Sequence, residues 1–195
     1  MFRIRKSSER FKPLSEECIR KCTAEIEKGP DFDAYTERAQ WWFDTDDYTR
    51  ALADYGAALQ LRPHPVIYTY RGETLARLGR YSEALADYSR AIDLNPRMTD
   101  AYERRASLLA TCADMNIRNG VQAIEDAKKA CLLSTDRRDC LETLAAAYAQ
   151  ERRFDAAVQT QERALALYPR SSAEGRAEKI AEAERRLALY RQSRA

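Results

Sequence analysis

The side chains that most often carry out chemistry in proteins are scarce in this 195-residue sequence, which contains one histidine and five cysteines. Cys18 and Cys22 are four residues apart and would share one face of a helix, but a zinc ion requires two further ligands at bonding distance. His64 stands between two prolines, and no serine or cysteine nucleophile accompanies it in a recognisable motif. The sequence also lacks the glycine-rich phosphate-binding loops and the HExxH metalloprotease motif. We therefore expect neither an enzyme nor a metal or cofactor site.

The other cysteines are expected to play structural roles as free thiols. An odd number of cysteines argues against a disulfide framework, and the sequence opens without the apolar stretch of a secretory signal. No apolar run approaches the ~20 residues needed to cross a bilayer. These features predict a protein of the reducing cytoplasm. Cys112 and Cys131 are interpreted as structural residues, and Cys140, which flanks the start of a predicted helix, would be reactive only if it were exposed.

Charged residues are numerous but nearly balanced. The 33 basic and 31 acidic residues leave a net charge of +2, which excludes a strongly polycationic protein. An apolar content of 45% with only six glycines and six prolines favours amphipathic helices over a turn-rich β fold. Residues 1–12 are basic and could contact nucleic acid or an anionic membrane. Because the rest of the chain is mildly acidic and would repel phosphate, nucleic acid is not an expected partner.

An internal repeat governs most of the chain. Pro30, Pro63 and Pro96 are spaced by 33 residues. Three segments share one pattern of small, aromatic and proline positions: DYTRALADYGAALQLRP (47–63), RYSEALADYSRAIDLNP (80–96) and RFDAAVQTQERALALYP (153–169). Apolar residues recur within each copy at helical spacing. A fixed period of this length indicates helical units that bury their apolar stripes by stacking on their neighbours.

The period and the residue types resemble the tetratricopeptide repeat, a helix–turn–helix unit of 34 residues. In that family positions 8, 20 and 27 are small, position 4 is aromatic or apolar, position 24 is aromatic, and position 32 is proline. The small positions are occupied by Ala39, Ala51 and Ala58 in the first copy, by Gly72, Ala84 and Ala91 in the second, and by Ala145, Ala157 and Ala164 in the fourth. The fourth copy departs at position 24, where Gln161 replaces the aromatic residue. The resemblance covers residues 32–169.

This resemblance implies an all-α fold, namely an α-solenoid in which the repeats wind into a right-handed superhelix with capping helices at both ends. We expect a mobile basic arm over residues 1–14, a capping half-repeat helix over 15–30, repeats over 32–64, 65–98, 99–136 and 138–170, and a C-terminal capping helix over 171–195. The third repeat has a lengthened turn, because five extra residues separate Leu109 from Ala123, and Thr135 replaces its closing proline.

The first helix of each repeat lines the concave groove in this family. Carried over by position, the resemblance implies a peptide-binding surface made of Asp33, Thr36, Glu37, Gln40 and Phe43 in the first repeat, Tyr70, Glu73 and Arg77 in the second, and Asp100, Glu103 and Arg104 in the third. Acids outnumber bases, and Phe43 and Tyr70 are not needed for the repeat core. Such a groove suits an extended or helical segment with lysine or arginine and an apolar anchor. The alternative is that these acids are simply a solvated face.

One subfamily binds the acidic C-terminal tails of chaperones through a clamp of lysine, asparagine and arginine side chains. The clamp positions of this sequence carry Thr36, Gln40, Tyr70, Asp100 and Arg104. Only Arg104 matches the clamp, and Asp100 would repel a carboxylate where a cation is needed. A carboxylate-clamp ligand is therefore not expected.

The sequence as a whole predicts a protein–protein interaction module, an adaptor or scaffold that binds a peptide or helix of a partner in the concave groove. Two other functions stay open at this point. The chain could be a structural scaffold that self-associates as a weak homo-oligomer, or a nucleic-acid or membrane accessory that acts through its basic N-terminal arm.

Overall fold

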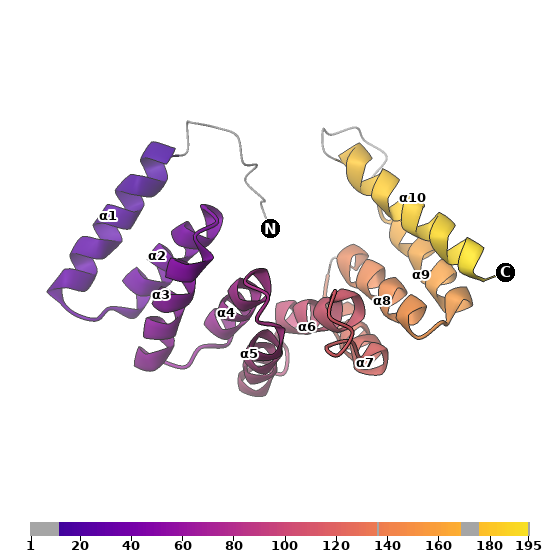
Figure 1. The fold of residues 1–195 in the computed structure, drawn as a ribbon, viewed down its shortest axis with the longest axis horizontal. Coiled ribbons are helices and arrows are strands. Elements are labelled where there is room, and N and C mark those ends of the chain that lie inside the picture. Colours follow the sequence, from indigo (N-terminus) through magenta and orange to yellow (C-terminus); the bar gives the residue numbers. More distant parts are fainter. Residues whose placement is uncertain (1–11, 136, 169–175, 195) are drawn as a thin grey trace. The chain divides into compact units, whose positions relative to one another are not determined.

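The computed structural model describes residues 12–135, 137–168 and 176–194. Across these residues the secondary structure consists of ten helices and no strand, which confirms the all-α class. The chain divides into two compact units, Met1–Pro96 and Arg97–Ala195. Each unit is built from antiparallel helix pairs joined by short turns (Figure 1).

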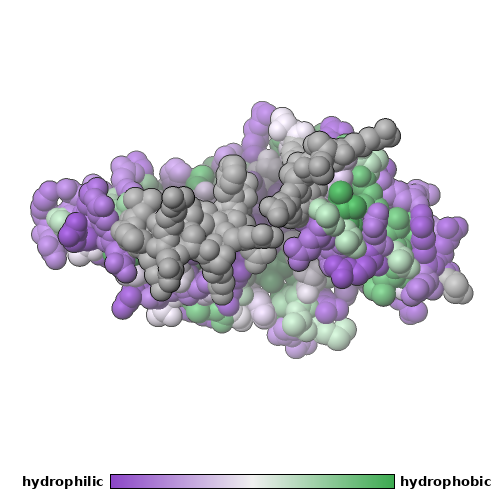
Figure 2. Space-filling view, turned by 90° about the horizontal axis from the view of Figure 1, so that it is seen from above, coloured by the Kyte–Doolittle hydropathy of each residue, from purple (hydrophilic) through white to green (hydrophobic). Residues whose placement is uncertain are grey.

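The first unit contains five helices, and each packs on the next along the chain. They are α1 (Lys12–Lys28), α2 (Phe32–Asp44), α3 (Tyr48–Leu61), α4 (Pro65–Arg77) and α5 (Tyr81–Leu94). Helix α1 begins at Lys12, and residues 1–11 of the expected basic arm lie outside the described residues. The exposed face of α1 is strongly charged, so hydrophilic residues cover this end of the unit (Figure 2). A polar outer face is what a helix that caps a repeat stack requires.

The second unit also contains five helices. They are α6 (Thr99–Thr111), α7 (Gly120–Leu133), α8 (Arg138–Gln150), α9 (Phe154–Ala166) and α10 (Arg176–Ser193). Successive helices pack together, and α6 also contacts α8 directly. Eight residues, 112–119, connect α6 to α7, whereas three residues, 78–80, connect α4 to α5. The connection is therefore longer by the five residues inferred from the sequence. Arg118 fastens it by donating from Nε to the carbonyl oxygen of Cys112 at 2.6 Å.

Small residues at the repeat positions form the contact between paired helices. Ala39 on α2 and Ala51 and Ala58 on α3 are fully buried, and they pack with Tyr55 in one apolar cluster. Alanine at these positions lets two helix backbones approach closely, while the tyrosine fills the space beside them. The same arrangement recurs around Ala145 and Ala157 in the second unit. The core thus lies along the seams between helices.

In each of three repeats, a buried ion pair joins the first helix to the second. In each pair an arginine donates from Nε and Nη2 to both carboxylate oxygens of an aspartate at 2.7 to 2.8 Å; the pairs are Arg38–Asp54, Arg71–Asp87 and Arg105–Asp126. Each guanidinium also lies 5.4 to 6.0 Å from the ring centre of a tyrosine three residues earlier in the same helix. Such bidentate contacts fix the geometry of two helices as well as their distance.

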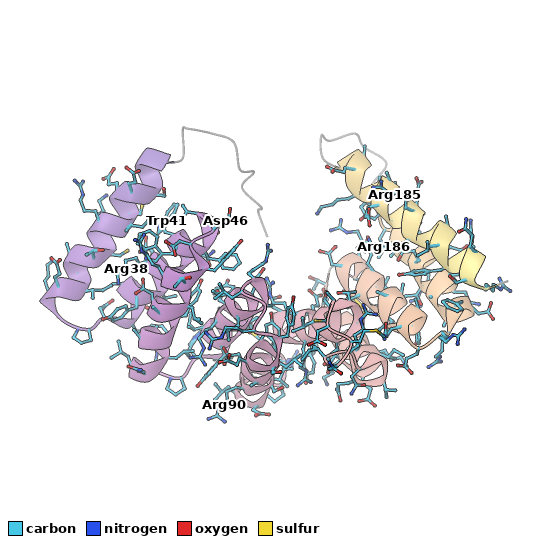
Figure 3. All side chains as sticks on the ribbon, in the orientation of Figure 1. Arg38, Trp41, Asp46, Arg90, Arg185 and Arg186 are labelled. Atoms are coloured by element: carbon cyan, nitrogen blue, oxygen red, sulfur yellow. A yellow bond between two sulfur atoms is a disulfide. The ribbon has the colours of Figure 1, made fainter. Side chains whose placement is uncertain are left out.

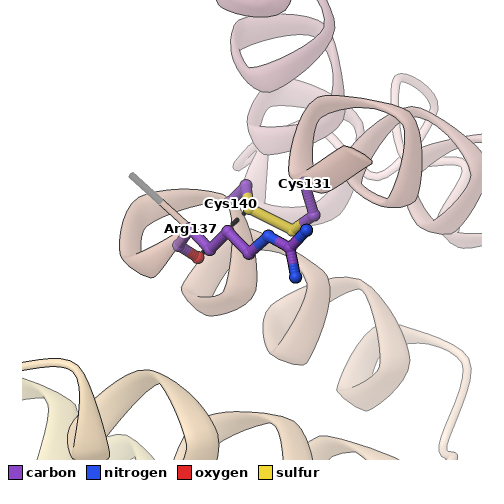
Figure 4. Close-up of a disulfide and its surroundings, with 3 residues drawn as sticks. All are labelled: Cys131, Arg137 and Cys140. Atoms are coloured by element: carbon purple, nitrogen blue, oxygen red, sulfur yellow. Dashed lines mark hydrogen bonds between the residues drawn. A yellow bond between two sulfur atoms is a disulfide. The ribbon is translucent and has the colours of Figure 1, made fainter. Parts of the chain in front are cut away.

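The structure corrects the expectation that all cysteines are free thiols. Cys131 and Cys140 form a disulfide with their Cα atoms 5.4 Å apart (Figure 4). Cys131 is in the last turn of α7 and Cys140 in the first turn of α8, so the short connection brings them within bonding range. An odd number of cysteines shows only that not every cysteine can be paired within the chain. It does not exclude one disulfide. Cys18, Cys22 and Cys112 are free, and Cys140 is fully buried.

Candidate functional site

The predicted groove residues of the first unit lie on two helices. Asp33, Thr36, Glu37, Gln40 and Phe43 belong to α2, and Tyr70, Glu73 and Arg77 belong to α4. Asp33, Glu37 and Arg77 are exposed, Glu73 is buried, and the others are half-buried. The structure therefore separates the set into an exposed N-terminal part of α2 and a more enclosed region near the C-terminal ends of both helices.

Aromatic rings gather in this enclosed region. The Phe43 ring meets the Tyr48 ring edge to face with their centres 5.3 Å apart, and the Arg77 guanidinium lies 5.9 Å from the Phe43 centre. Tyr70 on α4 lies 6.2 Å, centre to centre, from Tyr55 on α3. Phe43 and Tyr70 both pack against the same core cluster while keeping part of their surface accessible. They can therefore offer apolar area to a ligand without leaving the fold.

Polar groups connect these rings. The Tyr55 hydroxyl donates to Oε1 of Gln40 at 3.2 Å, and Nε2 of Gln40 donates to Oδ1 of Asp44 at 3.0 Å. Glu73 and Arg77 form a looser ion pair with 3.6 Å between Oε1 and Nη2. We call Gln40, Phe43, Asp44, Tyr70, Glu73 and Arg77 the α2–α4 cluster. Asp44 was not among the residues predicted from the sequence. Tyr55 of α3 occupies a core position of the repeat, and its hydroxyl bonds to Gln40 of the cluster.

The carboxylates give this cluster an acidic character. Partial burial raises the pKa of Asp44 above its usual range; the amide of Gln40 opposes this, and the negative charge of Glu73 adds to it. Burial also raises the pKa of the Tyr55 hydroxyl, which keeps it a neutral donor to Gln40 at ordinary pH. A cation that approached Asp44 and Glu73 would reduce the electrostatic repulsion between these two carboxylates.

Thr36 is not bonded to the α2–α4 cluster, because its hydroxyl is used within its own helix. Its hydroxyl donates to the carbonyl oxygen of Phe32 one turn earlier at 2.8 Å, so its donor is used within α2. Asp33 and Glu37 are exposed on the N-terminal half of the same helix. Asp33 and Glu37 can contribute charge to a bound chain, but among the described residues no hydrogen bond or ion pair joins either of them to the α2–α4 cluster.

Two of the three predicted residues of the second unit, Asp100 and Glu103, line a pocket. An open hollow of about 320 Å³ is lined by Thr99, Asp100, Glu103, Leu133, Ser134, Thr135 and Asp139. Three of its lining residues are carboxylates, and Asp139 pairs with Arg138 at 2.9 Å. Arg104, although it is on the same helix as Asp100 and Glu103, is half-buried and does not line the pocket.

A further acid of the second unit is bound by the chain's own C-terminal helix. Glu142 on α8 accepts a hydrogen bond from Nη2 of Arg186 on α10 at 2.5 Å and another from the Tyr168 hydroxyl at 2.7 Å. Figure 3 shows Arg186 on the side of α10 that faces α8 and α9. Burial, together with the hydrogen bond to Glu142, raises the pKa of Tyr168 to about 12. Glu142 is therefore engaged within the unit and is not available to a partner.

Within the described parts of the chain, no group of three or more histidine, cysteine, aspartate or glutamate side chains could hold a metal ion. Nor does any described helix combine the length and apolar character needed to span a membrane.

Comparisons with known proteins agree with this architecture. Residues 65–98 and 139–171 match models of the tetratricopeptide repeat family. No curated protein matches the sequence. Among solved structures, the fold is similar to that of MamA, with a TM-score of 0.70 and 18% identity over 89% of this chain and 95% of that chain.

Two further structures show the same likeness. YrrB, described as a TPR protein with an unusual peptide-binding site, has a TM-score of 0.70 and 17% identity over 89% of this chain and 84% of its own. A tetratricopeptide repeat protein from Parabacteroides merdae has a TM-score of 0.68 and 19% identity over 95% of this chain and 76% of its own. At such low identities the likeness concerns the fold alone.

Proposed function

We propose that this chain, a tetratricopeptide repeat protein, is a non-catalytic adaptor that binds a segment of a partner protein on the α2–α4 cluster. The observation that carries the proposal is the combination of half-buried rings with carboxylates on the same two helices: Phe43 and Tyr70 pack against one core cluster, Arg77 joins Phe43 to Glu73, and Gln40 binds Asp44. Rings supply contact area, and the carboxylates attract a cation, so the cluster suits a segment that places an apolar side chain next to a lysine or arginine.

The arrangement favours an anchor over a purely electrostatic contact. Exposed charges alone are screened by salt and contribute little. Partly accessible aromatic rings in a packed setting are typical of the residues that dominate binding energy. The N-terminal half of α2, with Asp33 and Glu37 exposed, extends the negative surface and would steer a basic segment toward the rings. The expected affinity is modest, on the order of micromolar.

The known fold supports this proposal. Repeats of this family typically take part in protein–protein interactions, and one of the similar structures is described as having a peptide-binding site. In the second unit, Asp100 and Glu103 would offer a basic side chain an additional contact in the pocket that they line. Arg104 stands apart from that pocket and would contribute least.

Affinity capture tests the proposal. Immobilised protein, exposed to native lysate, is compared with a Phe43→Ala/Glu73→Gln variant and with a matched control, Asp93→Asn/Leu94→Ala, whose residues are exposed on α5. Circular dichroism confirms that all three proteins are helical to the same extent. We expect proteins retained by the wild type and the control to be lost by the Phe43→Ala/Glu73→Gln variant. If that variant retains the same proteins as the wild type, the α2–α4 cluster is not the binding surface.

A further inference from the structure

The disulfide ties two repeats together at their junction. Cys131 belongs to the second helix of the third repeat and Cys140 to the first helix of the fourth, and the bond closes a ring that spans a sequence separation of nine residues (Figure 4). The corresponding connections after α3 and α5 contain Pro63 and Pro96, which restrict the backbone. Thr135 stands at that place here, and the disulfide constrains this connection instead.

The segment inside the ring forms one wall of the acidic pocket. Leu133, Ser134, Thr135 and Asp139 all lie between the two cysteines, and together with Thr99, Asp100 and Glu103 they make up the lining. Asp100 and Glu103 lie on α6, within its first two turns. The wall that faces them comes from the segment that the disulfide closes into a ring.

The two sulfurs differ in access. Cys131 is half-buried, whereas Cys140 is fully buried and its Sγ lies 3.1 Å from the carbonyl oxygen of Arg137. An external thiolate therefore reaches Cys131 first. Attack on Cys131 makes Cys140, in the first turn of α8, the leaving thiol. The geometry thus favours reduction through Cys131 with release of Cys140.

We infer that the Cys131–Cys140 bond is a reducible clamp that sets the shape of the acidic pocket. A dithiol reductant supplies the electrons. One of its thiolates attacks Sγ of Cys131, the S–S bond breaks, and its electron pair leaves on Sγ of Cys140, which takes up a proton. The second thiolate of the dithiol then displaces Cys131 as a thiol. The protein gains two thiols, the dithiol becomes a disulfide, and the connection between α7 and α8 is freed.

This inference concerns the second unit alone and does not depend on the binding proposed for the first. The test compares the full chain, oxidised with glutathione disulfide, with the same protein after treatment with dithiothreitol. Iodoacetamide labelling of the unfolded chain should count three thiols before reduction and five after it, because Cys18, Cys22 and Cys112 are free. Far-ultraviolet circular dichroism should be the same in both states.

Amide hydrogen exchange then measures how far the disulfide restrains the connection between α7 and α8. We expect amides of residues 132–140 to exchange at least tenfold faster after reduction, while those of residues 65–98 stay unchanged. Cys131→Ser should exchange like the reduced protein and ignore dithiothreitol, and it leaves the buried Cys140 in place. Cys112→Ser, a matched control, should respond as the wild type does. The inference is overturned if five thiols are labelled after oxidation, if residues 132–140 exchange equally in both states, or if dithiothreitol breaks the bond only once urea has unfolded the protein.

Discussion

Gly72 on α4 lies directly against the ring of Tyr88 on α5. A Cβ atom placed on Gly72 would stand 2.7 Å from Cε1 and 2.9 Å from Cδ1 of that ring, and 3.2 Å from the carbonyl oxygen of Ala84. Tyr88 is itself almost completely buried, so its ring has little room to withdraw. The small residue at this position therefore sets how closely the two helices of the second repeat approach.

Gly72→Ala should consequently destabilise the protein even though alanine favours helix. Overpacking of this kind costs about 1–3 kcal/mol, which outweighs a gain of up to about 1 kcal/mol in helix propensity. Urea unfolding measures the difference.

Gly56→Ala provides the matched control, because a Cβ at Gly56 on α3 would meet no atom within 4 Å. It should stabilise the protein by about 0.5–1 kcal/mol. Equal effects of the two substitutions would contradict the packing argument.

The sequence was sufficient to predict the pattern of helices, since the small residues recur at fixed positions and each is needed where two backbones meet. Ala39, Ala51 and Ala58, expected at such positions, are fully buried. Part of the candidate site was also accessible to sequence reasoning, because the position in the repeat specifies the helix face. What position could not specify is which residues of that face approach each other. Phe43 and Arg77 do so, whereas Asp33 remains exposed.

The buried ion pairs were missed although the sequence carries a signal for them. A tyrosine precedes each arginine by three residues, and the paired aspartate follows 16 residues later in Arg38–Asp54 and Arg71–Asp87, and 21 residues later in Arg105–Asp126. The longer separation in the third repeat equals the usual one plus the five inserted residues. The disulfide had no comparable signal in the sequence. The equivalent positions of the other repeats carry no cysteine pair, and only the fold brings Cys131 and Cys140 together.

Removing one partner of the Arg38–Asp54 pair should be costly. Asp54→Ala leaves a largely buried guanidinium without its two acceptors, and we expect a loss of about 2–3 kcal/mol in the free energy of unfolding. The fourth repeat suggests the compensating change, because buried Leu144 and Thr160 occupy the equivalent positions there. Arg38→Leu/Asp54→Thr should therefore recover most of the loss in the same denaturation experiment. A double variant as unstable as Asp54→Ala would contradict this.

Two turns between paired helices contain a residue with positive φ, and we expect substitutions there to change the free energy of unfolding in opposite directions. Gly79 and Arg152 are the middle residues of equivalent three-residue turns, and both adopt a positive φ, of 75° and 55° respectively. Residues with a Cβ resist this conformation. Gly79→Ala should therefore cost about 1 kcal/mol, and Arg152→Gly should gain roughly 0.5 kcal/mol. Thermal unfolding of both variants measures this, and a destabilised Arg152→Gly would show that the arginine side chain contributes more than its backbone conformation costs.

The raised pKa of Asp44 predicts a pH dependence. Because the folded state holds the proton more tightly than the unfolded state, the protonated carboxyl contributes stability below the unfolded pKa of about 4, and this contribution is lost as the pH rises through the folded pKa. Asp44→Asn keeps an acceptor for Gln40 and removes the charge. It should be more stable than the wild type at pH 7 and show no such gain at pH 3.5. Asp93→Asn, an exposed carboxylate on α5, is the control.

Gln161 predicts a stabilising change at the junction of α9 and α10. It is fully buried where the first two repeats have tyrosine, and its Nε2 donates to the carbonyl oxygen of Ala183 at a long 3.3 Å while its Oε1 has no partner. An unpaired buried oxygen costs about 1–3 kcal/mol, more than one long hydrogen bond contributes. Gln161→Met, which is close in volume, should therefore raise the free energy of unfolding by about 1 kcal/mol.

Gln161→Glu serves as the opposing variant, since it keeps the shape and places an ionisable group where no cation is bonded to the glutamine. It should lower stability at pH 7 and speed hydrogen exchange in residues 177–193, because α10 packs on α9 at this point. If Gln161→Met were less stable than the wild type, the hydrogen bond to Ala183 would contribute more than the unpaired oxygen costs, and the glutamine would help to hold α10 where the first two repeats have a tyrosine.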